Sequence, residues 1–236
     1  MAVWIDAIGA LQGTNVSGTS FNYSGITVGS PTNSALVLFL NHNASANPSA
    51  ITVHWDSAGT NQAMTLVGSA STSGIRARTY CLLNPTPGNK NLAVTWTTAD
   101  TVGMGAVSLG GVLQTSIATA FLNQITATYS VTNTPSLSVT CSTPGTDMVL
   151  AQCTSNQAFN SGPGFTDLWN AIMWTGGYYA FADAVQAAAS PQVFNWNISG
   201  AATTGSLIGL EAQWDGSSIA PGPTGPTDQG MVVCEW

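Results

Sequence analysis

The sequence predicts an all-β protein, an antiparallel β-sandwich of jelly-roll-like topology with about twelve strands. Apolar and polar residues alternate with period two along most of the chain, and helical periodicity is nearly absent. Clusters of Gly, Pro, Asn and Ser separate the short apolar stretches, as turns between strands do. Hydrophobic residues fill 44% of the 236 positions, enough for a core. Because sandwiches of about 200–250 residues often form one domain, we expect one sandwich domain over residues 1–214 and an extended tail over residues 215–236.

The clearest strand signals lie in the first half of the chain. ITVHW at Ile51–Trp55 alternates strictly, DSAGTNQ has the composition of a turn, and Ala63–Ser69 returns, so this stretch predicts a hairpin. Ile75–Leu83 and Leu92–Trp96 are two further strands. The segment NPTPGN between them cannot continue a ladder of hydrogen bonds, because proline lacks the N–H donor.

The remaining strand candidates follow at short intervals. They are Ser20–Val28, Ala35–Asn41, Met104–Leu109, Ile125–Ser130, Ser136–Cys141, Met148–Thr154, Ala171–Thr175, Gly177–Ala182, Phe194–Ile198 and Ser206–Trp214. Ala182–Ser190 fits either a short helix or a loop, since Pro191 would stop a helix. The tail is rich in Pro and Gly and ends in the apolar MVVCEW. We expect this end to dock as a strand or anchor on its own sandwich or on a neighbouring subunit.

The cysteines do not form a metal-binding pattern. No CxxC motif occurs and no histidine is spaced with a cysteine for zinc, so the sequence predicts no metal and no other cofactor. We expect Ser136–Cys141 and Met148–Cys153 to form a hairpin, which puts Cys141 and Cys153 more than ~10 Å apart. A disulfide needs Cα atoms within about 7 Å, so these two cysteines are predicted not to be bonded.

The charge composition narrows the classes of function. The chain has ten acidic and three basic residues, a formal charge of −7 and only 6% charged residues. Three cations cannot neutralise several phosphates, which argues against nucleic-acid binding and against binding to anionic membranes. The N-terminus lacks the pattern of a secretory signal, and no apolar run is long enough to span a bilayer. We therefore expect a soluble protein made in the cytoplasm.

Four stretches carry a resemblance to a known module: ALVLFLN, ITVHWDSAGTNQAMTLVGSA, RTYCLLNPTPGNKNLAVTW and GAVSLGGV. In this order they resemble a β-sandwich module that recurs in bacteriophage structural proteins and in bacterial surface or extracellular proteins. LWNAIMW and GSLIGLEAQW resemble its closing strands, so the likeness covers residues 1–214. The resemblance implies a sandwich fold and carries no catalytic signature. Cys81 departs from the pattern, which has an aliphatic or aromatic residue at this point.

All the positive charge lies in one short stretch that contains Arg76, Arg78 and Lys90. Alternation along Ile75–Leu83 puts both arginines on one face of a strand. One hypothesis is an edge strand that carries charge to prevent edge-to-edge pairing. The other is a docking patch for carboxylates of a neighbouring subunit, which arginine binds bidentately. The predicted inter-subunit contact also includes Cys234 and Trp236 at the end of the tail.

No catalytic residue is predicted, because no nucleophile, base and carboxylate are arranged in a recognisable pattern. His54 and Asp56 share a strand face but read as the end of a strand. Four carboxylates lie near aromatic residues, where they could form a glycan site, although carboxylates at loop ends in turns are the favoured interpretation: Asp167, Asp183, Glu211 and Asp215. Four aromatic residues either fill the core or form a glycan or receptor surface: Trp169, Trp174, Tyr178 and Tyr179.

Three functions fit these observations. The favoured one is a non-enzymatic virion structural protein of a bacteriophage, which decorates the capsid or forms part of a tail or fibre. Its partners would be a major capsid or tail protein and further copies of itself. The second is a carbohydrate-binding or adhesin module of an extracellular bacterial surface protein, with a host glycan as its ligand. The third is a polysaccharide-degrading enzyme on the same sandwich.

Overall fold

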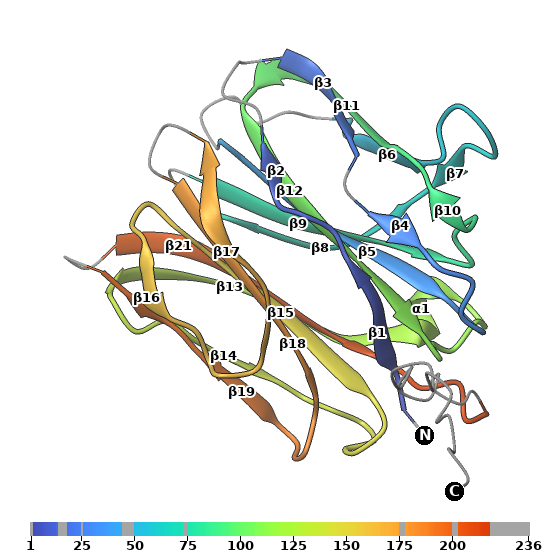
Figure 1. The fold of residues 1–236 in the computed structure, drawn as a ribbon. Helices are drawn as coiled ribbons and strands as arrows, with labels where there is room; N and C mark the ends of the chain where they lie inside the picture. Colours follow the sequence, from blue (N-terminus) through green and yellow to red (C-terminus); the bar gives the residue numbers. More distant parts are fainter. Residues whose placement is uncertain are drawn as a thin grey trace, which may run out of the picture.

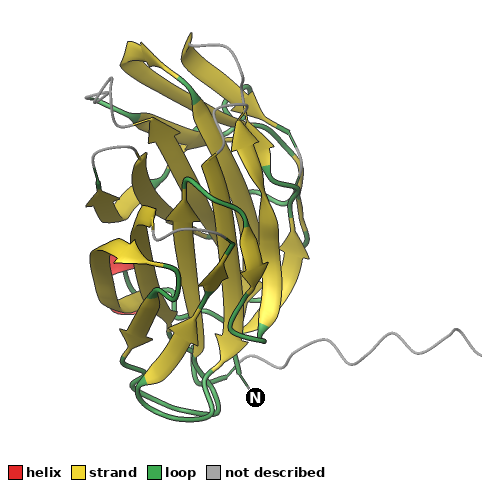
Figure 2. Ribbon diagram, turned by 90° about the vertical axis from the view of Figure 1, so that its left-hand side faces the viewer, coloured by secondary structure: helices red, strands yellow, loops and turns green. Residues whose placement is uncertain are grey.

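The computed structural model describes residues 2–13, 18–24, 26–43, 50–72, 75–174, 178–199 and 203–217. Antiparallel strands stacked in four layers make up nearly all of it (Figure 1; Figure 2). The predicted all-β sandwich is confirmed, and the chain forms two such sandwiches. The N-terminal half, residues 3–112, builds layers 1 and 2, and the C-terminal half, residues 117–214, builds layers 3 and 4.

The layers contain the following strands in spatial order. Layer 1 consists of β3 (Gly18–Tyr23), β11 (Leu92–Asp100), β6 (Thr52–Trp55) and β7 (Gln62–Ala63). Layer 2 consists of β1 (Trp4–Ile8), β12 (Val102–Gly110), β5 (Ala35–Asn43), β9 (Ile75–Leu83) and β8 (Thr65–Ser71), with β2 (Gln12–Gly13) beside β12. Layer 3 consists of β13 (Phe121–Thr132), β21 (Thr203–Ala212), β15 (Met148–Ser155), β18 (Tyr178–Gln186) and β17 (Thr166–Trp174). Layer 4 consists of the pairs β14 (Ser136–Val139) with β19 (Gln192–Asn195) and β16 (Phe159–Ser161) with β20 (Asn197–Ile198).

Two small elements complete the fold. A short pair joins β4 (Thr27–Val28) to β10 (Gly88–Asn89). The helix α1 (Ile117–Ala120) connects the halves, and the Ser116 side chain caps it by accepting a hydrogen bond from the backbone N–H of Thr119.

The two halves repeat one topology. The layer 2 order β1-β12-β5-β9-β8 corresponds strand by strand to the layer 3 order β13-β21-β15-β18-β17. In the outer layers, β3 corresponds to β14, β11 corresponds to the consecutive strands β19 and β20, and β6 corresponds to β16. This is the strand order of a jelly roll. Two buried tryptophans also correspond: Trp96 in β11 ends the stretch LAVTW, and Trp196, between β19 and β20, ends the similar stretch QVFNW.

Three apolar cores hold the four layers together. Layers 2 and 3 pack face to face through residues such as Val37, Phe39 and Leu150. The other two cores lie between layers 1 and 2 and between layers 3 and 4. Strands β12 and β15 are buried along their whole length because both of their faces are covered. The same double burial explains the continuous apolar run ALVLFL in β5, which does not alternate.

The structure corrects two expected pairings in the N-terminal half. The hairpin of Ile51–Trp55 with Ala63–Ser69 is limited to two residue pairs between β6 and β7, after which β8 joins β9 in layer 2. Strand β9 lies between β5 and β8. It is therefore not an edge strand, and the hypothesis that its arginines protect an edge is wrong.

Two expectations for the C-terminal half are also wrong. Strand β14 pairs with β19, whereas β15 pairs with β18 and β21, so no hairpin joins Cys141 to Cys153. Both cysteines are nevertheless free thiols, so the prediction that they are not bonded is confirmed. Ala182–Gln186 is the end of β18 rather than a helix. Its alanines at 182 and 184 are small enough to pack between layers 2 and 3.

Candidate functional site

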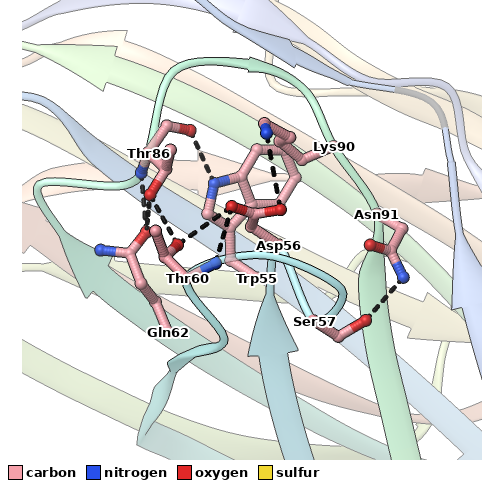
Figure 3. A network of polar contacts seen from close by, with 8 residues as sticks. All are labelled: Trp55, Asp56, Ser57, Thr60, Gln62, Thr86, Lys90 and Asn91. Carbon is pink, nitrogen blue, oxygen red and sulfur yellow. Dashed lines mark hydrogen bonds and ion pairs between the residues drawn. The ribbon is translucent and has the colours of Figure 1, made fainter.

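The Lys90 end of the basic stretch is part of a turn network (Figure 3). The Lys90 ammonium lies 3.6 Å from the Asp56 carboxylate, in a turn where Asp56 has φ 51°. The same carboxylate accepts hydrogen bonds of 3.0 Å from the backbone N–H and the hydroxyl of Thr60. The Thr60 backbone donor is the main cause of a lowered pKa of Asp56. Gln62 and Trp55 extend the network to the backbone of Thr86.

The two arginines lie at a different place. Both are half-buried on the face of β9 that points toward layer 1. Nearby, Nδ1 of the fully buried His42 lies 3.0 Å from the Asp100 carboxylate. Burial first, and then the charge of Arg78, lowers the pKa of His42 to about 4, while burial raises the pKa of Asp100 to about 6. At neutral pH the imidazole is therefore neutral and donates from Nδ1 to the ionised carboxylate.

The three cations consequently do not form one patch. Asp100, beside the arginines, ends β11, whereas Lys90 precedes Leu92 at its start. The nine residues of β11 separate these points by about 26 Å at ~3.3 Å per residue. The charge of Arg76 also acts on the Asp100 carboxylate of the same chain, since it lowers the pKa of that group. A contact of these cations with another chain remains a prediction.

The aromatic residues predicted for a glycan surface do not form one exposed group either. Trp169 is 7% exposed, and its indole N–H donates to the Gly9 carbonyl at 2.5 Å in the other half of the chain. It is a core residue and cannot stack on a sugar, because both ring faces are covered by protein. Tyr179 is half-buried. For Trp174 and Tyr178 the structure describes the backbone alone, and Cys234 and Trp236 lie outside the described residues.

Asp167 and Asp183 form a pair of carboxyl groups across β17 and β18. Asp183 is fully buried and accepts a hydrogen bond of 3.1 Å from the indole of Trp196. Burial in the first place, and the neighbouring exposed Asp167 to a smaller extent, raise the pKa of Asp183 to about 8. Oδ1 of Asp183 has no N–H or O–H donor among the described residues. At neutral pH Asp183 is therefore largely protonated, and its O–H is available to donate to Asp167 on the neighbouring strand.

A second buried cluster joins Cys141, Asp147 and Glu211, whose ligand atoms lie within 4.8 Å of one another. Burial raises the pKa of Asp147, and it raises the pKa of the Cys141 thiol to about 11. A thiolate and two carboxylates are ligands that zinc accepts. Here, however, Glu211 accepts from Ser142 and Asn123, and Asp147 accepts from the backbone of Thr143 and Trp214. These donors explain the cluster without an ion.

Sequence reasoning missed this cluster because its members come from three separate segments. Cys141 follows β14, Asp147 precedes β15, and Glu211 lies in β21. No short motif joins them, so only the pairing of β15 with β21 brings them together. The fourth carboxylate singled out in the sequence, Asp215, instead bonds Asn33 in the N-terminal half.

A pocket of about 310 Å³ opens between β8 and β13. Its walls are Ser69, Ala70 and Ser71 on one strand and Thr126, Ala127 and Thr128 on the other. Both strands are the last of their sheets, so the pocket lies on the side of the molecule where the edges of layers 2 and 3 meet. None of the lining residues is titratable, so the pocket suits binding rather than acid–base chemistry.

Comparisons with known proteins add a distant structural neighbour. No protein-family model and no curated protein sequence match the chain. A solved structure, the crystal structure of PBSX exported protein XepA, aligns over 89% of this chain and 86% of that chain. Its TM-score is 0.22 and its identity 10%, so the likeness is weak. Within the described residues, no helix has the length and hydropathy needed to cross a membrane.

Proposed function

We propose that this chain is a non-enzymatic structural protein of a bacteriophage particle, which decorates the capsid or forms part of a tail or fibre. One observation carries the proposal: every acidic side chain in the described residues contacts a group of its own chain. Asp6, for example, accepts from Gly29 and Ser108, and Asp100 contacts His42. The charged groups thus hold loops and layers in place, as expected of a rigid building block.

Composition and sequence pattern support the same function. A surface with few charges suits a protein that is packed into an assembly, because fewer ions lose their hydration when surfaces meet. The jelly roll that the sequence pattern implied is present in both halves. The chain would be made in the host cytoplasm and would act on the virion, with a major capsid or tail protein and further copies of itself as partners.

The two alternatives have less support from the geometry. Glycosidases place two carboxyl groups roughly 5–9.5 Å apart on either side of a sugar. Asp167 and Asp183 are in hydrogen-bond contact, and Asp183 is fully buried. Of the aromatic residues predicted for a glycan surface, Trp169 is buried in the core. Tyr179 is half-buried and is the one whose described side chain is still partly accessible.

The test is the composition of purified particles from the native source. We expect mass spectrometry to find the chain in particles banded by density, and electron microscopy with a specific antibody to locate it on their surface. Absence of the chain from washed particles would overturn the proposal. A glycan array with the wild-type protein and Tyr179→Ala, and an assay for released reducing ends, would then decide between the other two functions.

The same particles test the docking of the arginines. If Arg76 and Arg78 contact a neighbouring subunit, the double replacement by Ser lowers particle occupancy and makes it more sensitive to salt. Lys90→Ser, at the other end of β11, tests the third predicted cation on its own. Unchanged occupancy of the double variant would restrict the arginines to their contacts within the chain.

A further inference from the structure

The interface between the two halves contains two counterpart positions with very different residues. The pairing of β8 with β9 is interrupted between Leu66 and Gly68, and the pairing of β17 with β18 is interrupted between Asp167 and Trp169. These bulges lie at the same place in the repeated topology. Gly68 of the N-terminal half therefore corresponds to Trp169 of the C-terminal half.

Each position begins a row of residues that pair across its sheet. In layer 2 the row is Gly68, Thr79, Phe39 and Gly105, and in layer 3 it is Trp169, Ala182, Gln152 and Ile208. The two rows pack against each other and run in opposite directions, so the first residue of each row faces the last residue of the other. A Cβ atom on Gly105 would lie 2.5 Å from the ring of Trp169, and a Cβ atom on Gly68 would lie 3.0 Å from Ile208.

The two ends of this interface are filled to different extents. At one end the Trp169 ring lies over Gly105, contacts Phe39 edge-on at 5.7 Å between ring centroids and bonds the Gly9 carbonyl. At the other end Gly68 provides no side chain. The pocket of about 310 Å³ lies beside it, because Ser69–Ser71 directly follow Gly68 and Thr126 lies 3.7 Å from the position of its Cβ. An aromatic side chain is thus present at one site and lacking at its counterpart.

The strands around the pocket are suited to accept another strand. Strands β8 and β13 end their sheets and contain neither charged residues nor proline, the usual protection of an edge. Residues 125–128 pair regularly with β21 on one side, so their other side offers backbone donors and acceptors in regular spacing.

We infer that the C-terminal segment Met231–Trp236 of a second copy of this chain binds along β13, with Trp236 in the pocket beside Gly68. This inference rests on the proposed role in an assembly and names the partner. The segment MVVCEW is apolar and ends in tryptophan, the residue that fills the counterpart site. Aromatic side chains bury ~150–250 Å² each, which makes them strong anchors in such pockets.

The position of the chain end favours a second copy over the same chain. Ala212 at the end of β21 pairs with Phe121 at the start of β13, and the described chain ends at Ser217. A strand antiparallel to β13, like every strand pair described here, must enter from the Thr132 end, about 36 Å away at ~3.3 Å per residue. Residues 218–230 span at most about 40 Å at ~3.1 Å per residue. A chain that bound its own segment would have almost no slack.

Photo-crosslinking tests this inference directly. A photoreactive phenylalanine analogue replaces Trp236 in the full chain, and equal amounts of isotopically light and heavy protein are mixed before irradiation. We expect cross-links between light and heavy chains at residues 69–71 or 126–128. Thr128→Trp, which fills the pocket, should reduce them at least tenfold. Thr98→Trp, at an exposed position of β11 in layer 1 and away from β13, is the matched control and should leave them unchanged.

The other outcomes overturn either this inference or the proposed virion function. Cross-links within single chains would show that the segment binds its own sandwich. Cross-links to other residues, or none at protein concentrations where the chain associates, would exclude this pocket. If the chain is found on particles but these cross-links are absent, the docking site alone is wrong. If the cross-links form but the particles lack the chain, the virion function is wrong.

Discussion

The N-terminal and C-terminal halves arrange corresponding strands in the same order, yet counterpart positions carry different chemistry. In the first strand of each half a bulged residue bonds a side chain of the neighbouring strand: the Asp6 carboxylate accepts from Ser108 in β12, and also from the backbone of Gly29, whereas the Asn123 amide donates to Glu211 in β21. Donor and acceptor have exchanged places. An unpaired buried polar group costs ~1–3 kcal/mol, so the fold requires that the polar groups at this corner are paired. Either strand can provide the donor.

Side-chain size shows the same freedom. Trp169 faces Gly105 at one end of the interface, and Gly68 faces Ile208 at the other. A large residue opposite a small one keeps the sheets at their spacing in both cases, since sandwich layers pack ~10 Å apart. What differs is the remaining space, which is filled at the first site and open as a pocket at the second.

The largest expected effect comes from removing the side chain that distinguishes these two ends. Trp169→Ala should lower the free energy of unfolding by about 3–5 kcal/mol, because it leaves a cavity between the halves and removes the bond to Gly9. Urea denaturation measures this change. Val193→Ala, at an exposed position, is the control. A loss below about 1 kcal/mol would mean that Trp169 does not hold the halves together.

The next largest effect concerns Asp183, whose counterpart in the N-terminal half is Tyr80. The pKa of Asp183 is raised to about 8, so its contribution to stability is complete below the unfolded pKa of about 3.9 and is lost as the pH rises through 8. Between pH 5 and 8 the free energy of unfolding should fall by at most about 4 kcal/mol, since each pH unit contributes about 1.4 kcal/mol.

Asp183→Asn should flatten this pH dependence, because asparagine stays neutral and still accepts from Trp196. Tyr80→Phe is the matched control in the other half and should leave the pH dependence as it is. Thermal unfolding at half-unit pH intervals provides the measurement. An Asp183→Asn variant with the wild-type slope would show that the titration of Asp183 does not cause this pH dependence.

A smaller effect is expected at the corner where Asp6 and Asn123 exchange roles. Asp6→Ala leaves the Gly29 N–H and the Ser108 hydroxyl without their acceptor and should cost about 1–2 kcal/mol. Hydrogen exchange of the Gly29 amide should accelerate by the factor that corresponds to this free energy, about tenfold for ~1.4 kcal/mol. Asn123→Gly tests the C-terminal half without backbone strain, since Asn123 has φ 48° and glycine accepts positive φ. If neither variant changes exchange in its loop, the corners are not stabilised by these bonds.

The smallest expected effect separates the two groups of cations. Arg78→Ser removes a charge that lowers the pKa of His42, so the titration of His42 should move upward from its value of about 4. Proton NMR of the imidazole ring measures the shift. Lys90→Gln, at the other end of β11, should leave His42 unchanged. Equal shifts in both variants would contradict the separation of the two groups.

Functional clusters were harder to predict from the sequence than secondary structure. The turn at Asp56 and the strand with Arg76 and Arg78 follow from local alternation and turn residues. The contact of His42 with Asp100 joins residues 58 positions apart, and the bond from Trp169 to Gly9 joins residues 160 apart. Such contacts depend on the pairing of distant strands, which local patterns do not encode.

The sequence by itself determined that the chain is all-β and where most strands lie. Period-two alternation and turn residues are local, so they can be read along the chain. Only the tertiary structure decided that there are two sandwiches, which layer each strand joins and that Trp169 is buried. Counterpart strands are separated by 113 residues between Ala35 and Met148 but by 103 between Ile75 and Tyr178, so the repeat does not appear as a fixed period. The two halves share their backbone pairing and the packing of a large residue against a glycine, and neither property belongs to any single residue.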